Sequence, residues 1–289
     1  MVSIIVPVFN RLDCTRQCTD AILAHTQDIP YEIILVDNAS TDGTSTHLAT
    51  LSDPARVITN TVNRGFACAC NQGAAAARGD VLVFLNNDTQ VLPHWLSPLI
   101  ETLADETVGM VGNRLVYPDG RIQHAGVIFV LWAEQSRFFF DHVFRGFNGQ
   151  DPRVCLANEF QMVTGACMAM RQRDFVDLKG FDERYWNGLE DIDLCARVGV
   201  SGKKIVYQPA SCVIHAESQS GPERHAKLAQ NNELLGQTWG GKLCPDFVIK
   251  GQEVCLGSAL KIKAYRGNHT EQTLAEMLTF IHNKYLRSQ

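Results

Sequence analysis

Polar residues follow three apolar segments in the first third of the sequence, and their types suit the binding of a charged ligand. Asn10 and Arg11, Asp37 and Asp88 each come at the end of such a segment. In an open parallel sheet, ligands bind beyond the carboxyl ends of the strands, so we expect these side chains at one edge. Asp is also a common turn and helix-cap residue, which is the alternative explanation for each carboxylate taken alone.

The residue types narrow the ligand that this edge could bind. Neither a G-x-G-x-x-G loop nor a Walker A lysine loop follows the first apolar segment, so the usual backbone cradles for phosphate are missing. A diphosphate could instead be neutralised by a divalent cation held on carboxylate oxygens. Asp88 is the best-placed metal ligand, and Asp37 suits a hydrogen bond to a base or a ribose.

Three carboxylates stand close together in the second half, at Glu190, Asp191 and Asp193. Successive side chains at a helix start differ in direction by about 100°, so the three cannot all point one way. Asp193 lies four residues before Arg197, the spacing of an ordinary helical ion pair, and we assign it that structural role. Glu190 and Asp191 then face a cleft or the first helical turn. The alternative is that they only complement the helix dipole.

The segments that must position these residues alternate between strands and helices. Apolar runs and helical periodicity predict strands at residues 2–8, 32–36, 57–58 and 81–85, with helices around 14–25 and 66–77. This alternation predicts a parallel α/β sheet with right-handed crossovers over roughly the first 110 residues. The helix around 66–77 has a face of small residues and should pack close to its neighbour.

The second half has a mixed pattern. We expect a helix at 93–104, a short strand at 108–111, an aromatic-rich loop from about Trp132 to Phe147, strands at 163–170, 205–207 and 213–214, and helices at 192–198, 223–239 and 270–285. No linker separates the halves. We therefore predict one domain of residues 1–243, with halves 1–112 and 113–243, and a C-terminal helical appendage at 244–289.

Composition excludes some classes of protein. The 289 residues are 45% hydrophobic and 20% charged with a net charge of −5, which disfavours a disordered chain and a nucleic-acid binder. Ten cysteines without a CxxC pair are expected to be small core residues in a reducing compartment. No signal peptide is visible, and the longest apolar stretch, residues 127–133, is too short for a transmembrane segment. We expect a cytoplasmic protein, with peripheral contact at the inner face of the cell membrane left open.

An ordered set of motifs then resembles one enzyme family. The motifs are residues 6–11 (VPVFNR), 36–44 (VDNASTDGT), 63–67 (NRGFA), 86–88 (NND), 164–166 (TGA), 180–183 (GFDE) and 188–194 (GLEDIDL). In this order they resemble the inverting family 2 glycosyltransferases of GT-A fold, over about residues 2–240. The resemblance implies a mostly parallel central sheet flanked by helices, with a Rossmann-like nucleotide half and a mixed acceptor half.

The resemblance also implies roles for individual residues. The nucleotide-binding positions that it implies are Pro7, Asn10, Arg11, Asp37, Asn63, Arg64, Asn86 and Asn87. Asp88 and His215 match metal-contacting positions, which implies Mg²⁺ or Mn²⁺ as the cofactor. Asn86 stands where many members have the first Asp of the metal motif. Asp191 matches the catalytic base, and Glu190 is expected to contact the acceptor.

Further residues carry two interpretations each. Gly165 could allow close approach of the acceptor or form a β-bulge, and Trp186 could stack on a sugar or lie in the core. His124 could line the acceptor cleft, although packing in the core is the preferred interpretation. Arg224 and His225 are weaker candidates for phosphate contact.

These features predict transfer of one sugar, with inversion, from a UDP- or dTDP-sugar to a hydroxyl group. The expected acceptor is a saccharide or a lipid-linked saccharide in bacterial polysaccharide or glycan biosynthesis. The expected mechanism is metal-assisted direct displacement with a carboxylate base. Two alternatives stay open, a non-catalytic nucleotide- or glycan-binding module of the same fold, and a nucleotidyltransferase. The nucleotidyltransferase should have a Gly-rich basic loop after the first strand.

Overall fold

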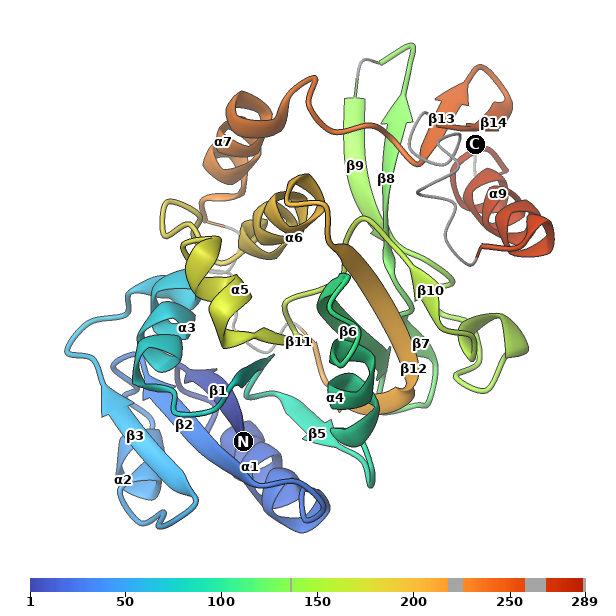
Figure 1. The fold of residues 1–289 in the computed structure, drawn as a ribbon. Coiled ribbons are helices and arrows are strands. Elements are labelled where there is room, and N and C mark those ends of the chain that lie inside the picture. Colours follow the sequence, from blue (N-terminus) through green and yellow to red (C-terminus); the bar gives the residue numbers. More distant parts are fainter. Residues whose placement is uncertain (136, 218–225, 258–268, 288–289) are drawn as a thin grey trace.

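The first strand, β1 (Val2–Val8), lies inside the parallel part of the main sheet, and nearly all of its residues are buried. It pairs in parallel with β2 (Tyr31–Asp37) and β4 (Val81–Leu85), and β2 pairs in parallel with β3 (Ala55–Thr59). The computed structural model describes residues 1–135, 137–217, 226–257 and 269–287 (Figure 1). Because these strands run in one direction, their carboxyl ends meet at one edge, as the alternation predicted.

The main sheet continues beyond β4 with strands of both directions. β11 (Cys167–Arg171) is antiparallel to β4 and to β6 (Val108–Val116), whereas β12 (Lys204–His215) is parallel to β6. The short strands that complete the sheet are β5 (Thr89–Val91), β7 (Ile122–His124) and β10 (Asn158–Glu159). Ten strands of the described residues form this sheet along the order β10-β12-β6-β11-β4-β1-β2-β3, with β5 on β12 and β7 on β6. The predicted α/β class with a large central sheet is confirmed.

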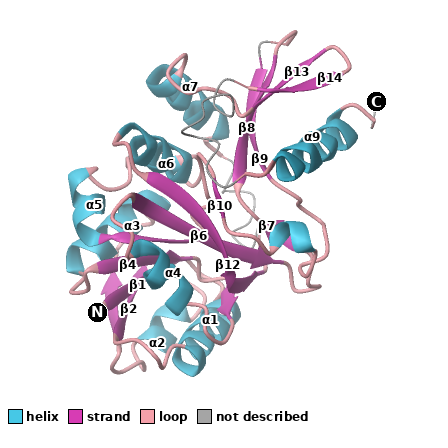
Figure 2. Cartoon of the chain, turned by 45° about the vertical axis from the view of Figure 1, so that its right-hand side comes forward, coloured by secondary structure: helices cyan, strands magenta, loops and turns pink. Residues whose placement is uncertain are grey.

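Helices cover both faces of the main sheet, as Figures 1 and 2 show. One apolar cluster contains residues of α3 (Gly65–Ala76), α5 (Gln172–Asp177), α6 (Glu190–Val200) and α7 (Leu228–Trp239). The other contains residues of α1 (Leu12–His25), α2 (Thr44–Leu48) and α4 (Ser97–Leu103). Side chains alternate along a strand, so Ile5 of β1 joins the first cluster while Ile4 and Val6 join the second.

A smaller sheet, in the order β14-β13-β8-β9, stands beside the main one. Its central hairpin is β8 (Val127–Trp132) and β9 (Arg137–His142), so the prediction of a loop from about Trp132 to Phe147 is wrong for β9. Phe140 lies opposite Phe129 with ring centroids 5.2 Å apart, and Phe139 contacts Tyr285. The run Phe138-Phe139-Phe140 places aromatic side chains on both faces of β9, so the strand lacks the apolar–polar alternation of a half-buried strand.

The residues after 244 contain more than the expected helix. β13 (Phe247–Lys250) pairs in parallel with β8 and antiparallel with β14 (Glu253–Leu256), and α9 (Glu271–Tyr285) joins a third apolar cluster with Phe247. The appendage is therefore not only helical, and the boundary at 244 stays a prediction.

No helix in the described ranges is both long and apolar enough to cross a bilayer. A short 3-10 helix spans Pro152–Val154.

The strand β12 replaces the two short strands that were predicted at 205–207 and 213–214. Its pairing with β6 shifts register between Gln208 and Cys212, and Pro209 lies inside this irregular stretch. Proline inside a sheet is confined to edges and bulges. A proline at this position favours the end of a strand. In the structure, β12 instead continues past Pro209 to His215.

Close packing of α3 on the sheet gives the first testable prediction. A Cβ added at Gly73 would lie 2.4 Å from Cγ2 of Ile5, whereas one added at Gly236 in α7 would meet nothing within 4 Å. Gly73→Ala should lower the free energy of unfolding by about 1–3 kcal/mol through overpacking, and Gly236→Ala should raise it by up to about 1 kcal/mol. Urea denaturation measures both. Equal effects of the two substitutions would contradict close packing at Gly73.

Candidate active site

A pocket with a volume of about 320 Å³ opens at the edge of the main sheet where β1 and β4 end. Both halves of the chain line it. The predicted residues that contribute from the first half are Pro7, Asn63, Asn86, Asn87 and Asp88. Those from the second half are Gly165, Trp186, Glu190, Asp191 and His215. The volume falls in the range of small-molecule sites.

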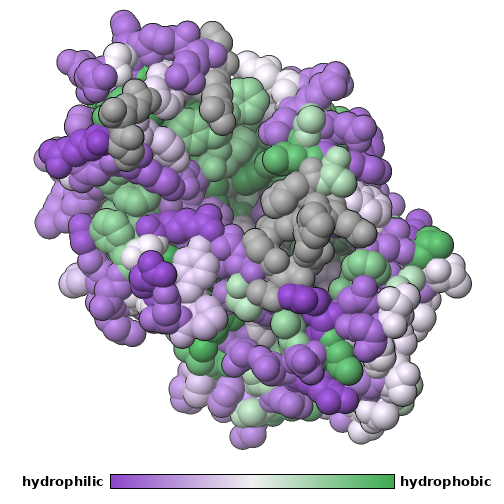
Figure 3. Space-filling view, turned by 180° about the vertical axis from the view of Figure 1, so that it is seen from behind, coloured by the Kyte–Doolittle hydropathy of each residue, from purple (hydrophilic) through white to green (hydrophobic). Residues whose placement is uncertain are grey.

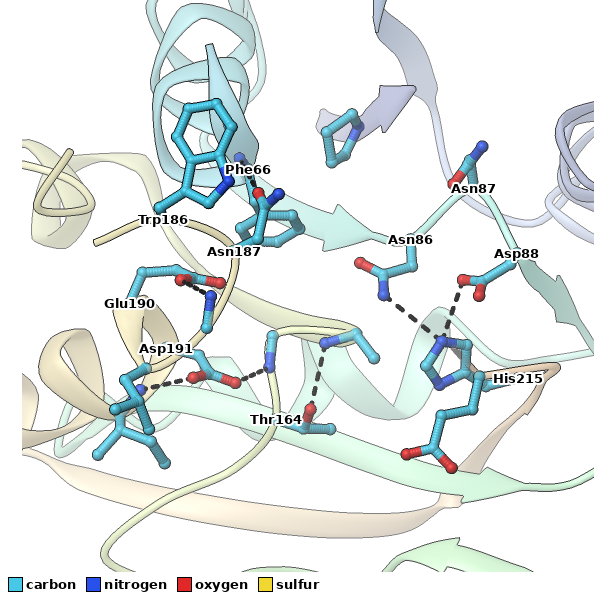
Figure 4. Close-up of a pocket in the computed structure, with 18 of the residues that line it drawn as sticks. Phe66, Asn86, Asn87, Asp88, Thr164, Trp186, Asn187, Glu190, Asp191 and His215 are labelled. Atoms are coloured by element: carbon cyan, nitrogen blue, oxygen red, sulfur yellow. Dashed lines mark hydrogen bonds and ion pairs between the residues drawn. The ribbon is translucent and has the colours of Figure 1, made fainter. Parts of the chain in front are cut away.

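One wall of the pocket holds Asp88 and His215 in contact. Oδ1 of Asp88 lies 3.0 Å from Nε2 of His215, and both side chains are buried. The contact follows from strand pairing, because Thr89 of β5 lies opposite His215 at the end of β12. The Asn86 amide nitrogen lies 3.4 Å from the same Nε2. The two residues predicted at metal-contacting positions therefore lie side by side (Figure 4), and their role in metal binding stays a prediction.

The donor atoms of this pair fit a divalent cation. Two neighbouring ligands of an octahedral ion with bonds of about 2.1 Å lie about 3 Å apart, which is the separation of Asp88 Oδ1 and His215 Nε2. The described residues contain no group of three or more His, Cys, Asp or Glu side chains that could hold a metal. This pair would supply two ligands, and phosphate oxygens and water could complete the coordination, as is common for Mg²⁺.

The charges that line the pocket are negative. Asp88, Glu190, Asp191 and Glu217 line it, and no Lys or Arg does among the described residues. Arg145 lies outside the lining and pairs with Glu217 at 2.6 Å. Burial raises the pKa of Glu217, but the Tyr117 hydroxyl and the Arg145 guanidinium outweigh burial, so the net pKa is lowered. An anionic ligand could bind in this pocket only together with a cation that offsets the negative charge of the lining.

Asp191 lies on the wall opposite the Asp88–His215 pair, at the N-terminus of α6 (Figure 4). Its Oδ2 accepts a hydrogen bond from the Gly165 backbone N–H at 2.8 Å, and its Oδ1 accepts one from the Ile192 N–H at 2.8 Å. A Cβ at Gly165 would lie 3.1 Å from Cβ of Asp191. Gly165 thus permits the close approach of Asp191 itself, a neighbour that the sequence analysis did not consider.

The other two acidic residues of α6 behave differently from Asp191. Asp193 pairs with Arg197 at 2.6 Å and accepts a hydrogen bond from the Trp239 indole, which confirms its structural role. Glu190 lines the pocket, and its Oε2 accepts the Gly188 backbone N–H at 2.5 Å. Glu190 therefore holds the loop that precedes the helix.

That loop, residues 186–189, has an unusual backbone conformation, and hydrogen bonds connect it to α3 and α7. Asn187, Gly188 and Leu189 all have positive φ. Oδ1 of Asn187 accepts the Phe66 N–H at 2.8 Å, and buried Asn231 of α7 bonds the backbone of Trp186 and Gly188 through three hydrogen bonds. These contacts fix the entry of the chain into α6.

Trp186 lies between the first half and α7, where its ring meets Gly65 and Lys227. A Cβ at Gly65 would be 3.1 Å from Cε3 of the indole, and Nζ of Lys227 is 4.6 Å from the ring centroid. The side chain lines the pocket and is half-buried. Trp186 therefore packs between these segments without being fully buried, and its contact with a sugar stays a prediction.

Four predicted nucleotide-binding residues do not line the pocket: Asn10, Arg11, Asp37 and Arg64. Asp37 is fully buried, and its carboxylate accepts hydrogen bonds from the Ser40 N–H at 2.9 Å and the Ser45 hydroxyl at 2.5 Å. Of the three aspartates with a predicted role in the site, Asp88 and Asp191 therefore line the pocket and Asp37 does not. Arg224 and His225 lie outside the described residues.

Gln123 is a pocket residue that sequence reasoning missed. In β7 the side chains alternate, so Gln123 reaches His215, with Oε1 2.6 Å from Nδ1, whereas His124 is fully buried. Burial lowers the pKa of His124 to about 3, which confirms the core interpretation for His124. The available signal was the alternation in Ile122-Gln123-His124.

The second missed group comes from the β8–β9 hairpin. Phe140 and His142 share one face of β9 and line the pocket. Nδ1 of His142 lies 2.8 Å from the Gln123 backbone oxygen, and burial lowers the pKa of His142. Figure 3 shows apolar colouring inside a hollow on the face seen from behind, in the upper part where β8 and β9 lie. This wall can offer an aromatic surface and a neutral imidazole to a ligand.

Comparison with known families and curated proteins supports an enzyme. The model of the family described as "Glycosyl transferase family 2" matches residues 3–178, and that described as "N-terminal domain of galactosyltransferase" matches residues 154–216. An O-antigen biosynthesis protein of Myxococcus xanthus is 34% identical over 76% of this chain. N-acetylglucosaminyl-diphospho-decaprenol L-rhamnosyltransferase of Mycobacterium tuberculosis is 26% identical over 74% of this chain and 76% of its own length.

The relatives differ from this chain in length. This chain spans 17% of the Myxococcus protein and 27% of an uncharacterised Sinorhizobium fredii protein, which is 29% identical over 83% of this chain. Two solved structures share the fold. A Pyrobaculum calidifontis mannosyltransferase with GDP-Man and Mn²⁺ has a TM-score of 0.58 at 21% identity, covering 82% of this chain and 64% of its own. GalNAc-T7 with UDP, GalNAc and Mn²⁺ has a TM-score of 0.63 at 15% identity. The match covers 98% of this chain and 55% of the GalNAc-T7 chain.

The second prediction concerns the loop before α6. Asn231→Ala removes three buried hydrogen bonds and should lower the free energy of unfolding by about 1–3 kcal/mol. Asn232→Ala is the matched control, because that neighbouring side chain is exposed and bonds only within its own helix, so its effect should stay within about 0.5 kcal/mol. Chemical denaturation measures both. A loss of similar size in the control would show that α7 itself, and not the loop contact, had been weakened.

Proposed function

The chain belongs to glycosyl transferase family 2 and has the GT-A fold, and from this we propose that it moves one sugar, with inversion, from a nucleotide-diphosphate sugar to a hydroxyl acceptor. The proposed donor is a UDP- or dTDP-sugar, with a hexosyl or rhamnosyl group to be transferred. The observation that carries the proposal is a single pocket with a carboxylate on one wall and a two-residue metal-ligand pair on the other. The rhamnosyltransferase relative supports this donor class.

The donor diphosphate would lie against Asp88 and His215. Because four carboxylates and no Lys or Arg of the described residues line the pocket, a divalent cation, Mg²⁺ or Mn²⁺, is needed to offset the repulsion. The cation would neutralise charge on the diphosphate as it leaves. The Mn²⁺ and nucleotides in the two solved structures support this role.

The nucleotide would extend over the ends of β1 and β4. Pro7, Asn63, Asn86 and Asn87 line that part of the pocket and supply an apolar contact and amide groups. For Asn10 and Asp37 we propose an indirect part, because their side chains bond the backbone of residues 40 and 41. Arg11 and Arg64 flank α1 and α3 as the residues before each helix, and we propose that they approach the phosphates only with the nucleotide bound.

Asp191 is the proposed base that takes the proton from the acceptor hydroxyl. Inversion by direct displacement needs the base and the leaving group on opposite faces of the sugar, and Asp191 faces the Asp88–His215 wall across the pocket (Figure 4). Its two backbone hydrogen bonds hold the carboxylate in one orientation. Each carboxylate oxygen keeps a further lone pair for the proton.

The acceptor would approach from the side of Glu190, Gly165 and Trp186. Phe140 and His142 add an aromatic ring and a hydrogen-bond acceptor to that side, which suits a saccharide with an apolar face and polar edges. We propose a saccharide or lipid-linked saccharide of bacterial polysaccharide or glycan biosynthesis, a class supported by the O-antigen and decaprenol relatives. A lipid-linked acceptor would bring the chain to the inner face of the cell membrane.

The third prediction tests the donor and the metal together. In a screen of UDP-, dTDP-, GDP- and CMP-sugars, thermal unfolding should shift upward with the UDP- or dTDP-sugars, and only when Mn²⁺ or Mg²⁺ is present, because the lining repels the free diphosphate. A ligand at 100 times its dissociation constant stabilises the folded state by about 2.7 kcal/mol. EDTA and Asp88→Asn should each abolish the shift, while Asp20→Asn on the exposed side of α1 should leave it unchanged. A full shift in EDTA would exclude the proposed metal.

The fourth prediction tests the base. Asp191→Asn keeps the size of the side chain but cannot take the proton, so kcat should fall about 10²–10⁴-fold. The dissociation constant of the nucleotide, measured by calorimetry with Mn²⁺, should change little. Asp177→Asn, an exposed acid on α5, is the control and should retain full activity. If the wild type binds the nucleotide but neither hydrolyses the donor nor transfers its sugar, the chain is a binding module.

A further inference from the structure

Gln123 holds two histidines of the pocket, one with each of its carbonyl groups. Its side-chain Oε1 lies 2.6 Å from Nδ1 of His215, and its backbone oxygen lies 2.8 Å from Nδ1 of His142. The residue is 1% exposed and comes from β7, whose neighbour His124 turns to the core. A three-residue strand thus supports both a metal-ligand candidate and the acceptor wall.

The direction of these hydrogen bonds follows from their partners. A carbonyl oxygen only accepts hydrogen bonds, so Nδ1 of each histidine is the donor and carries the proton. In the neutral ring the lone pair is then on Nε2. For His215 that atom faces Oδ1 of Asp88 at 3.0 Å, where the cation would bind. Metal-binding histidines commonly donate their other N–H to an oxygen, which orients the ring and sets its tautomer.

The side-chain amide nitrogen of Gln123 is the second feature, and it is unfavourable for the stability of the fold. Its Nε2 is buried and has no hydrogen-bond partner among the described residues. A buried amide group without a partner costs free energy, about 1–3 kcal/mol in proteins. An apolar side chain of the same length would avoid this cost. The benefit of glutamine at this position must therefore come from its oxygen, and that oxygen contacts His215.

We propose that Gln123 is the positioning residue of the metal site, which orients His215 and holds it in the Nδ1–H tautomer so that Nε2 binds the cation beside Asp88. The inference rests on the proposed function, since it takes the Asp88–His215 pair as the metal site. In this proposal Gln123 is neither a metal ligand nor a sugar-binding residue. It acts only through the imidazole of His215.

The fifth prediction compares three substitutions at two glutamines. Gln123→Met removes the oxygen and should weaken Mn²⁺ binding 10–100-fold. Thermal stability should change little, because removal of the unpaired amide offsets the loss of the acceptor for the His215 N–H. Gln123→Glu keeps an accepting oxygen and should restore binding to within a few-fold of the wild type. Gln90→Met is the matched control. Gln90 lies on β5 near Asp88, but its exposed side chain bonds Gln17, so binding should not change.

The measurement is a titration of the full chain with Mn²⁺, in which electron paramagnetic resonance counts the free ion, without any sugar donor and again with UDP. Nitrogen-15 NMR of the Mg²⁺-loaded protein reports the tautomer of His215 independently of affinity. The wild type should show a protonated Nδ1, and Gln123→Met should lose this preference. A protonated Nε2 in the wild type, or unchanged Mn²⁺ affinity in Gln123→Met, overturns the proposal.

An Asp88→Asn arm separates this inference from the proposed function. If Asp88→Asn loses Mn²⁺ while Gln123→Met retains it, the metal site stands and only the role of Gln123 fails. If the wild type binds no Mn²⁺, or Asp88→Asn binds it as tightly as the wild type, the metal site of the proposed function is wrong and the inference falls with it.

Discussion

The pairing of β5 with the end of β12 is the contact on which the pocket depends. Thr89 lies opposite His215 although 126 positions separate them in the sequence, and this single antiparallel register brings Asp88 against the His215 ring. The same pairing attaches the parallel half of the sheet to the mixed half at the edge where β1 and β4 end. A slip by one residue would turn His215 to the opposite face and separate the two side chains. The contact between Asp88 and His215 is therefore a consequence of sheet register rather than of a local motif.

The opposite wall is built in another way, from a strained loop that several side chains hold. Three consecutive residues with positive φ precede α6, a conformation that costs free energy for Asn187 and Leu189. Asn231, Glu190 and the Asn187 side chain offset this cost with hydrogen bonds to the loop or to α3. The result is that Asp191 starts the helix directly against Gly165. Strand pairing thus sets one wall, and side-chain hydrogen bonds between distant segments set the other.

The sequence predicted those parts of the molecule that local pattern determines. Apolar runs located β1, β2 and β4, their carboxyl ends met at one edge, and the four-residue spacing of Asp193 and Arg197 predicted their ion pair. The strand β9 was missed because aromatic residues follow one another on both of its faces, so its sequence shows no apolar–polar alternation. Gln123 and Asn231 were missed because their partners lie 92 and 45 positions away, and no local period marks such contacts. Asp37 was expected in the pocket because it ends a strand, yet Ser40 and Ser45 bond its carboxylate beneath the surface.

The charge of the pocket favours the proposed diffusible cation over a lysine or arginine side chain. A permanent guanidinium in this lining could pair with Asp191, stabilise the carboxylate and so weaken it as a base. Under the proposed function, a cation held by Asp88 and His215 would lie on the other wall, against the leaving diphosphate and away from the acceptor. With only these two protein ligands, the diphosphate would complete its coordination. The positive charge would then arrive with the donor and depart with the product, and no fixed positive charge would lie beside Asp191.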